Sequence, residues 1–227
     1  MNNKINFIFD FDSTLVKTES LNDILTLSLG NNKEKIQQLE QLTKLAMEGK
    51  LSFKESLEKR LTLSTITKSM INNIINKTLD EITDNIESVI KNIYKYDNTN
   101  IYIVSGGFVD VIEPIAKKLN IKSNNIYANK FIFNNQNEVI GIENTLLLQE
   151  CGKAKVIQDL KDKNLINGKT IMIGDGYTDL ETYLTKAVDK YICFCGVIAR
   201  QSVIEKSQII ANNVQDLIDI CTKEINE

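Results

Sequence analysis

The sequence predicts an α/β protein in which a doubly wound parallel sheet carries a helical segment inserted after its first strand. Three short apolar runs each break into a turn that carries polar side chains. Helical patterns follow the second and third of these runs. Residues 17–96, by contrast, contain several amphipathic helical patterns and no convincing strand.

The three apolar runs are typical of strands buried on both faces of a sheet. They are Ile5–Phe9, which ends at Asp10; Ile101–Val104, which ends at Ser105-Gly106-Gly107; and Ile171–Ile173, which ends at Gly174-Asp175-Gly176. Ligands of such sheets bind beyond the carboxyl ends of the strands, so we expect these polar groups to converge on one site.

The remaining core elements alternate between strand and helix. Helices are expected at Phe108–Leu119, Thr178–Leu184, Ala199–Lys206 and Val214–Cys221, a fourth strand at Tyr191–Phe194, and a β-hairpin at Lys130–Phe133 and Val139–Ile142. In the helical segment, Ile36/Leu39/Leu42/Leu45 and Ile82/Ile86/Val89/Ile93 form apolar stripes, and Ser52-Phe53-Lys54-Glu55 matches a capping box. We therefore predict a core of residues 1–16 and 97–227, with a smaller cap of residues 17–96 above the active edge of the sheet.

Composition narrows the chemistry. The 227 residues include no histidine, which excludes Ser-His-Asp triads, phosphohistidine chemistry and most zinc sites. A net charge of −3 offers no footprint for nucleic acid or for an anionic membrane. Four sparse cysteines, no signal peptide and no long apolar run predict a cytoplasmic protein without a disulfide framework.

Asp10-Phe11-Asp12 places two carboxylates on the same side of an extended chain. Acids that close repel each other unless a cation or a shared proton stabilises them. Mg²⁺ suits a site with few carboxylates and a phosphate, and Asp175 can supply a third carboxylate. Taken alone, the same acids could also be a helix cap or a turn cluster.

The other turns can serve a phosphate. Ser105-Gly106-Gly107 leads into a predicted helix, so its hydroxyl and backbone N–H groups form either an anion cradle or an ordinary N-cap. Lys153 and Lys155 open a helix after Cys151-Gly152, and either could reach a phosphate or remain solvated. In the third turn, Thr178 or Asp179 could instead cap the following helix.

The combination is more specific than its parts. The chain resembles the haloacid dehalogenase (HAD) superfamily and, within it, the phosphoserine phosphatase family. The resemblance runs through FDFDSTLVKTES, SFKESLEKRL, IVSGGF, GKAKVIQDLK, MIGDGYTD and ARQSV. It implies a HAD-like fold and Mg²⁺-dependent hydrolysis of O-phospho-L-serine to L-serine and phosphate, through an aspartyl-phosphate, as the last step of serine biosynthesis.

The resemblance also implies roles for individual residues. The catalytic residues are Asp10 as nucleophile, Asp12 as general acid/base, and Ser105 and Lys153. The metal ligands are Asp10, the Asp12 backbone carbonyl and Asp175. Ser105, Gly106 and Lys153 bind the phosphate. Asp179 supports the metal and the lysine, and Thr178 is counted among the substrate-binding residues.

Arg60 and Arg200 are the chain's two arginines. Arg60 follows Leu57 by three residues, which places it on the apolar face of its helix, and its fork suits bidentate binding of a carboxylate. From the resemblance, Arg60 binds the substrate carboxylate, Glu19 binds its ammonium, Met47 and Phe53 shield the pocket, and Arg200 lies beside the site. The alternatives are an internal ion pair for Arg60, plain cap core for Met47 and Phe53, and a surface salt bridge for Arg200.

Two other classes of function share parts of this pattern. One is a phosphatase or phosphotransferase for another small metabolite, and the other is a receiver-like phospho-acceptor module, which needs neither a cap nor Asp12. A nucleotide-binding loop is excluded because Gly168-Lys169-Thr170 leads into a strand. The expected partner is a small phosphomonoester, with no nucleic acid and no membrane, and the sequence leaves open whether the protein is a homodimer.

Overall fold

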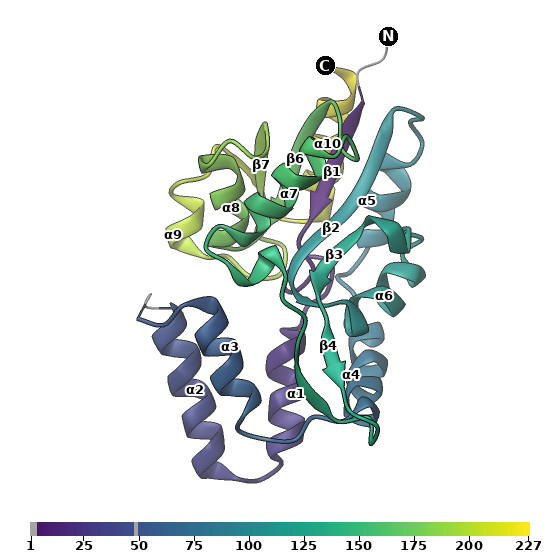
Figure 1. Cartoon of the computed structure of the whole chain (residues 1–227). Helices are drawn as coiled ribbons and strands as arrows, with labels where there is room; N and C mark the ends of the chain where they lie inside the picture. The colour runs from purple at the N-terminus through teal and green to yellow at the C-terminus, as the bar shows by residue number, and fades with distance from the viewer. Residues whose placement is uncertain (1–3, 48–49) are drawn as a thin grey trace.

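The computed structural model describes residues 4–47 and 50–227. Its main sheet has six parallel strands in the order β3-β2-β1-β6-β7-β8, with helices on both faces (Figure 1). The strands of this sheet are β1 (Ile5–Phe9), β2 (Thr99–Phe108), β3 (Ile126–Asn129), β6 (Lys169–Gly174), β7 (Lys190–Phe194) and β8 (Ile209–Ala211). A separate pair is formed by β4 (Phe131–Phe133) and β5 (Val139–Ile142). The predicted α/β fold with a parallel sheet is confirmed.

The helices fall into two groups. Those that cover the sheet are α5 (Ile86–Ile93), α6 (Val109–Lys118), α7 (Gly152–Asp162), α8 (Tyr177–Leu184), α9 (Gln201–Ile204) and α10 (Val214–Asn226). Those of the cap are α1 (Ser20–Leu29), α2 (Lys33–Met47), α3 (Phe53–Leu61) and α4 (Lys68–Asp80), and they lie together beyond one end of the sheet (Figure 1).

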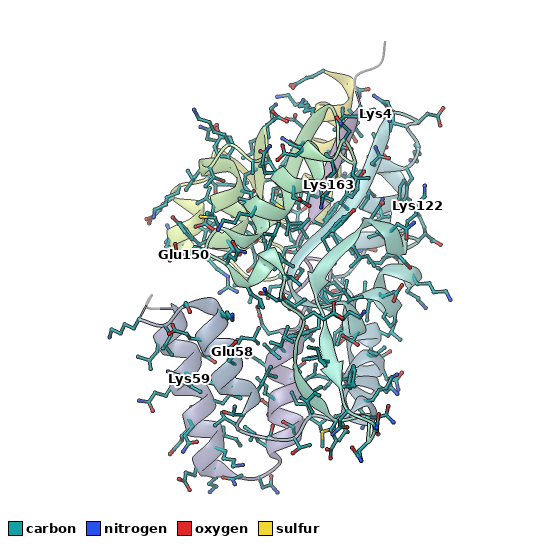
Figure 2. The ribbon with its side chains drawn as sticks, viewed as in Figure 1. Lys4, Glu58, Lys59, Lys122, Glu150 and Lys163 are labelled. Carbon is teal, nitrogen blue, oxygen red and sulfur yellow. The ribbon has the colours of Figure 1, made fainter. Side chains whose placement is uncertain are left out.

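The central strand β1 is buried on both faces because its apolar run has no polar alternation. Phe7 and Phe9 pack into a cluster that includes α5, α6 and α10, while Ile8 packs into a second cluster that includes α7, α8 and α9. Charged side chains such as Lys59, Lys122 and Glu150 project from the outer surface (Figure 2). The double burial fixes the tip of β1 firmly, and this tip carries Asp10.

The β-hairpin connects the core to the cap. β4 and β5 pair antiparallel, as predicted, and the hairpin then pairs with the chain that precedes α4. The Val139 N–H donates to the Ile66 carbonyl at 2.8 Å, and the Lys68 N–H donates to the Asn137 carbonyl at 2.9 Å. Helix α5 packs against α10 and β2 on the sheet. The division into a core and a cap of residues 17–96 remains our prediction.

The positions of the central strands were predicted correctly from the sequence, but the end of β2 was not. β2 does not stop at Val104 but continues through Ser105-Gly106-Gly107 to Phe108, with an irregular register against β3. The Asn129 side-chain amide donates to the Gly106 carbonyl at 2.8 Å, which holds this bulged stretch to its neighbour. The expected turn is therefore wrong, and α6 begins only at Val109.

Two further features bear on the predictions. All four cysteines are free, so the expectation of no disulfide framework is confirmed. Within the described residues, no helix combines the length and apolar character needed to cross a bilayer.

Candidate active site

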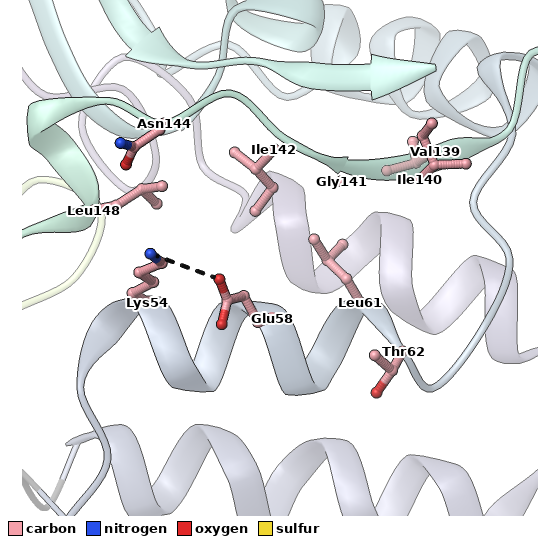
Figure 3. A pocket seen from close by; sticks show the side chains of 10 residues that line it. All are labelled: Lys54, Glu58, Leu61, Thr62, Val139, Ile140, Gly141, Ile142, Asn144 and Leu148. Atoms are coloured by element: carbon pink, nitrogen blue, oxygen red, sulfur yellow. Dashed lines mark ion pairs between the residues drawn. The ribbon is translucent and has the colours of Figure 1, made fainter. Parts of the chain in front are cut away.

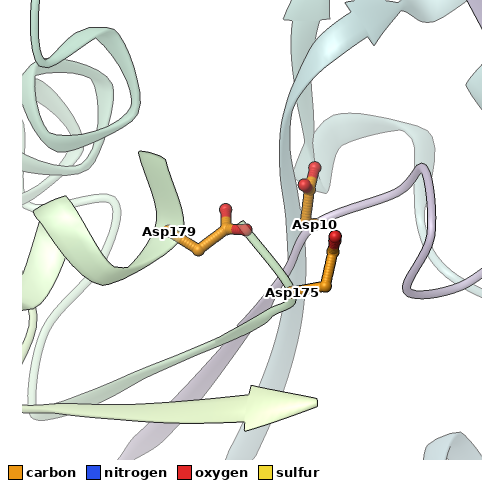
Figure 4. Close-up of side chains that lie close together, drawn as sticks. All are labelled: Asp10, Asp175 and Asp179. Atoms are coloured by element: carbon orange, nitrogen blue, oxygen red, sulfur yellow. The ribbon is translucent and has the colours of Figure 1, made fainter. Parts of the chain in front are cut away.

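Three acids meet at the carboxyl edge of the sheet. Asp10 follows β1, Asp175 follows β6, and Asp179 lies in the first turn of α8, and each offers a carboxylate oxygen within 4.8 Å of the others (Figure 4). β1 and β6 are neighbours, and the Asp10 N–H continues their ladder by donating to the Ile173 carbonyl at 2.9 Å. Strand pairing therefore brings acids 165 residues apart in the sequence to one point.

Glycines around Asp175 leave room for Asp179. The Asp179 carboxylate accepts the Gly176 N–H at 3.0 Å, which is the N-terminal capping contact of α8. A Cβ on Gly174 would overlap this carboxylate. Asp179 is thus fully buried and held in one position, whereas Thr178 on the same turn is exposed.

We expect Gly174→Ala to displace Asp179 and lower kcat for the proposed substrate by about 10- to 100-fold, because misplacing supporting groups by about 1 Å has costs of this order. Gly141→Ala is the matched control, because a Cβ there would meet only the end of the Ile132 side chain, at 3.9 Å. Unchanged kcat in Gly174→Ala would mean that the position of Asp179 does not matter.

Lys153 supplies the positive charge in this cluster. Its ammonium lies 2.8 Å from Asp10 Oδ2 and 2.6 Å from Asp179 Oδ1, and the side chain is only 7% exposed. Burial alone would lower the pKa of Lys153, but the two carboxylates outweigh it and hold the pKa above its ordinary value. Lys153 therefore keeps its proton at neutral pH.

The start of α7 aims Lys153 at the acids. Cys151 adopts a left-handed conformation with φ 53°, and Gly152 packs directly on backbone atoms of Leu147. A Cβ at Gly152 would lie 2.6 Å from the Leu147 carbonyl oxygen, so only glycine allows this approach. Lys155, two residues further along α7, instead pairs with the Gln149 side chain at the surface and remains outside the site.

The cluster has more negative than positive charge and fits a divalent cation. Burial and the nearby Asp10 raise the pKa of Asp175 to about 6, and the Arg200 guanidinium limits that rise. Burial next to Asp10 also raises the pKa of Asp179, against the opposing effect of Lys153. A set of carboxylate oxygens in this state of repulsion is the donor type that a hard cation such as Mg²⁺ stabilises.

Asp12 points away from the acid cluster and towards the cap. Its Oδ1 accepts the Ser20 N–H at 2.9 Å and its Oδ2 accepts the Ser20 hydroxyl at 3.1 Å, at the start of α1. Burial raises the pKa of Asp12 to about 8, so the carboxyl group holds a proton at neutral pH. Its side chain is therefore placed as a proton donor rather than as a member of the acid cluster.

The bulged end of β2 lies beside Asp12. Ser105 is buried, its hydroxyl accepts the Gly107 N–H at 3.1 Å, and a Cβ on Gly107 would lie 3.3 Å from Asp12 Oδ2. The Ser-Gly segment is thus close to Asp12, although it lies on a strand bulge rather than at a helix N-terminus.

Arg60 is an unusual buried cation. It is 8% exposed on α3, its Nη1 donates to Asn22 Oδ1 at 3.3 Å, and its Nε has no hydrogen-bond partner. Within the described residues no carboxylate lies at ion-pair distance from it. Burial lowers the pKa of Arg60, and the charge of Glu19 opposes this. A buried guanidinium without an anion is costly, so an anionic ligand would stabilise it.

Glu19 and Arg200 face each other across the join between cap and core. Glu19 Oε1 accepts the Ser13 hydroxyl at 2.8 Å and lies 3.4 Å from Arg200 Nη2, while Arg200 Nε donates to Asp175 Oδ2 at 2.7 Å. The side chains of Met47 and Phe53 lie outside the described part of the structure.

Sequence reasoning missed three contributors. Ser20 holds Asp12, Thr14 donates its hydroxyl to Asp175 Oδ1 at 3.3 Å, and Asn22 contacts Arg60. The sequence does not show how such side chains are oriented. The only available signal for these contacts was the presence of hydroxyl residues close to the DFD motif.

A separate pocket of about 410 Å³ lies between α3 and the hairpin (Figure 3). Its lining combines apolar side chains such as Leu61, Ile142 and Leu148 with the Lys54–Glu58 ion pair. None of the clustered acids lines it, so this pocket is distinct from the candidate active site.

Comparison with known proteins agrees with this geometry. The model of the haloacid dehalogenase-like hydrolase family matches residues 7–183, which include the acid cluster and Lys153. The chain belongs to the haloacid dehalogenase-like hydrolase family.

Curated relatives of the chain include several that are named phosphoserine phosphatase. The chloroplastic phosphoserine phosphatase of Arabidopsis thaliana is 33% identical over 93% of this chain and 70% of its own length. A crystal structure of a phosphoserine phosphohydrolase-like protein from Francisella tularensis is 36% identical, with a TM-score of 0.82 over 95% of this chain and 98% of the other. A phospho-aspartyl intermediate analogue of phosphoserine phosphatase is 27% identical, with a TM-score of 0.77 over 96% and 99%. The chain therefore groups with the phosphoserine phosphatases of the HAD family.

Proposed function

We propose that this HAD hydrolase is a Mg²⁺-dependent phosphoserine phosphatase that converts O-phospho-L-serine into L-serine and phosphate. The choice of phosphoserine as the substrate is supported by Arg60, a buried guanidinium with an unpaired Nε. Its contact Asn22 lies on the same first turn of α1 as Ser20, which holds Asp12. The contacts of Arg60 and of Asp12 therefore lie on the same turn of one helix.

The phosphoryl group is transferred in two steps. A carboxylate oxygen of Asp10 attacks phosphorus, the bond from phosphorus to the serine oxygen breaks, and that oxygen takes the proton of Asp12. A water oxygen then attacks the phosphorus of the aspartyl-phosphate while Asp12 accepts a proton from it. Phosphate leaves, and both aspartates return to their starting states.

Positive charge makes the attack of one anion on another feasible. Lys153 already contacts Asp10 and is held by Asp179, so it stands where the equatorial phosphate oxygens gather charge. Asp10, the Asp12 backbone carbonyl and Asp175 would hold Mg²⁺, whose Lewis acidity further neutralises the phosphate. Ser105 and Gly106 are proposed to bind phosphate oxygens, and Thr178 and Arg200 to lie at the edge of the substrate.

Substrate selection comes from the cap. Arg60 is proposed to bind the serine carboxylate and Glu19 the ammonium, with Met47 and Phe53 excluding water. Formation of serine places the reaction at the end of serine biosynthesis. The free cysteines fit a reducing compartment such as the cytoplasm.

Steady-state kinetics with phosphoserine, phosphothreonine and 4-nitrophenyl phosphate tests the proposal. We expect kcat/KM to be highest for phosphoserine, to vanish when divalent ions are chelated, and to return with Mg²⁺. Equal kcat/KM for all three substrates would remove the assignment to phosphoserine and leave a general phosphatase. Transfer of the phosphoryl group to an acceptor other than water would instead indicate a phosphotransferase.

A further inference from the structure

We propose that Arg200 is a built-in competitor of the metal: its guanidinium pairs with Asp175, and metal binding releases it. The inference rests on the proposed function, because it takes Asp175 as a metal ligand. It concerns this chain's own arginine, and it predicts a property of metal binding rather than a step of the reaction.

Both oxygens of Asp175 accept a hydrogen bond. Oδ2 accepts the Arg200 Nε–H at 2.7 Å, and Oδ1 accepts the Thr14 hydroxyl at 3.3 Å. The carboxylate is almost fully buried, whereas the Arg200 side chain is 35% exposed. A cation that coordinates Asp175 competes with these two donors for the same carboxylate, and Arg200 is the one with space to leave.

The balance of charge favours exchange of one cation for the other. Lys153 already lies between Asp10 and Asp179, so among the described residues Arg200 is the cation that compensates Asp175. A guanidinium cannot lose its proton at physiological pH, so it leaves Asp175 only by moving. Mg²⁺ and the Arg200 guanidinium then compete for the charge of the same carboxylate.

The second contact of Arg200 extends the effect to the cap. Its Nη2 lies 3.4 Å from Glu19 Oε1, and Glu19 immediately precedes α1. Arg200 therefore joins the acid cluster of the core to the first residue before the cap helices. When a metal takes Asp175, this link between core and cap is lost, and Glu19 no longer shares its guanidinium partner with Asp175.

Calorimetric titration with Mg²⁺ measures the competition directly. We expect Arg200→Gln to lower the Kd of Mg²⁺ at least about fivefold, because it removes the charge-assisted hydrogen bond that competes with the metal for Asp175. Lys206→Gln is the matched control. It removes the same charge close by, but its ammonium lies over the Tyr177 ring, 5.5 Å from the centroid, rather than on Asp175. An equal gain in both variants would reduce the effect to long-range charge and overturn the inference.

Side-chain NMR gives an independent readout, because the chain has two arginines and thus two Nε–H signals to assign. We expect Mg²⁺ to shift the Arg200 signal in step with the calorimetric Kd and to leave the Arg60 signal in place. An unmoved Arg200 signal at saturating Mg²⁺ overturns the inference even if Asp175 binds the metal.

The two proposals fail in different ways. If Asp175→Asn binds Mg²⁺ as tightly as the wild type, the metal site of the proposed function is wrong, and the competition falls with it. If Asp175→Asn weakens binding while Arg200→Gln does not strengthen it, only the competition is wrong.

Discussion

Asp10→Asn is expected to reduce kcat/KM for phosphoserine to below about a hundredth of the wild-type value, because an amide oxygen cannot form an acyl-phosphate. The side chain keeps its shape, and the apolar strand that carries it is buried on both faces, so the fold is expected to persist. Steady-state kinetics and circular dichroism check the two parts.

The matched control for this change is Asp97→Asn, the same isosteric substitution at an exposed position outside the site. It is expected to leave kcat/KM unchanged. Activity of Asp10→Asn above a hundredth of wild type, in protein shown by mass spectrometry to be free of deamidation, would mean that another group attacks phosphorus.

Arg60→Met is expected to harm function and to help stability. Loss of the carboxylate contact should lower kcat/KM for phosphoserine by about 10²- to 10³-fold, on the scale of 3–5 kcal/mol for breaking a buried ion pair. An aryl phosphate without a carboxylate should be affected less than about threefold. The free energy of unfolding without substrate should rise by about 1–3 kcal/mol, because an unpaired buried charge is replaced by an apolar side chain of similar volume.

Kinetics with both substrates and chemical denaturation measure these effects together. Arg60→Lys keeps the charge but loses the bidentate fork. It should therefore not gain the stability expected of Arg60→Met, and it should still lose much of the phosphoserine activity. If Arg60→Met slows both substrates equally and also destabilises the protein, Arg60 is a structural residue and the basis for substrate choice is removed.

Local patterns in the sequence were sufficient to bring Asp10 and Asp175 together, whereas the choice of Lys153 over Lys155 came from the family resemblance. Asp10 and Asp175 each follow an apolar run that ends abruptly, and parallel strands bring their carboxyl ends to one edge whatever the rest of the chain does. The helix that carries Lys153 was likewise predicted from its Cys-Gly start. Such features depend on a few neighbouring residues, so they can be found without a structure.

Features that depend on tertiary partners could not be predicted in this way. The edge strands β3 and β8 were missed because they are short and gain their strand character by pairing with β2 and β7. The continuation of β2 through Ser105 depends on Asn129, which is 24 residues away. The contact of Asp12 with Ser20 and that of Asp175 with Arg200 depend on side-chain rotamers, for which sequence spacing gives no rule.

Chemical trapping of the reacting enzyme tests the central claim most directly. Enzyme mixed with phosphoserine and Mg²⁺ would be quenched with acid within one turnover and reduced with borohydride, which converts an acyl-phosphate of aspartate into homoserine. Mass spectrometry of the peptides should then find homoserine at position 10 and at no other aspartate, and only when substrate is present. An unmodified Asp10 at the time when serine is being released, or homoserine formed at Asp175 instead, would contradict the assignment of Asp10 as the nucleophile.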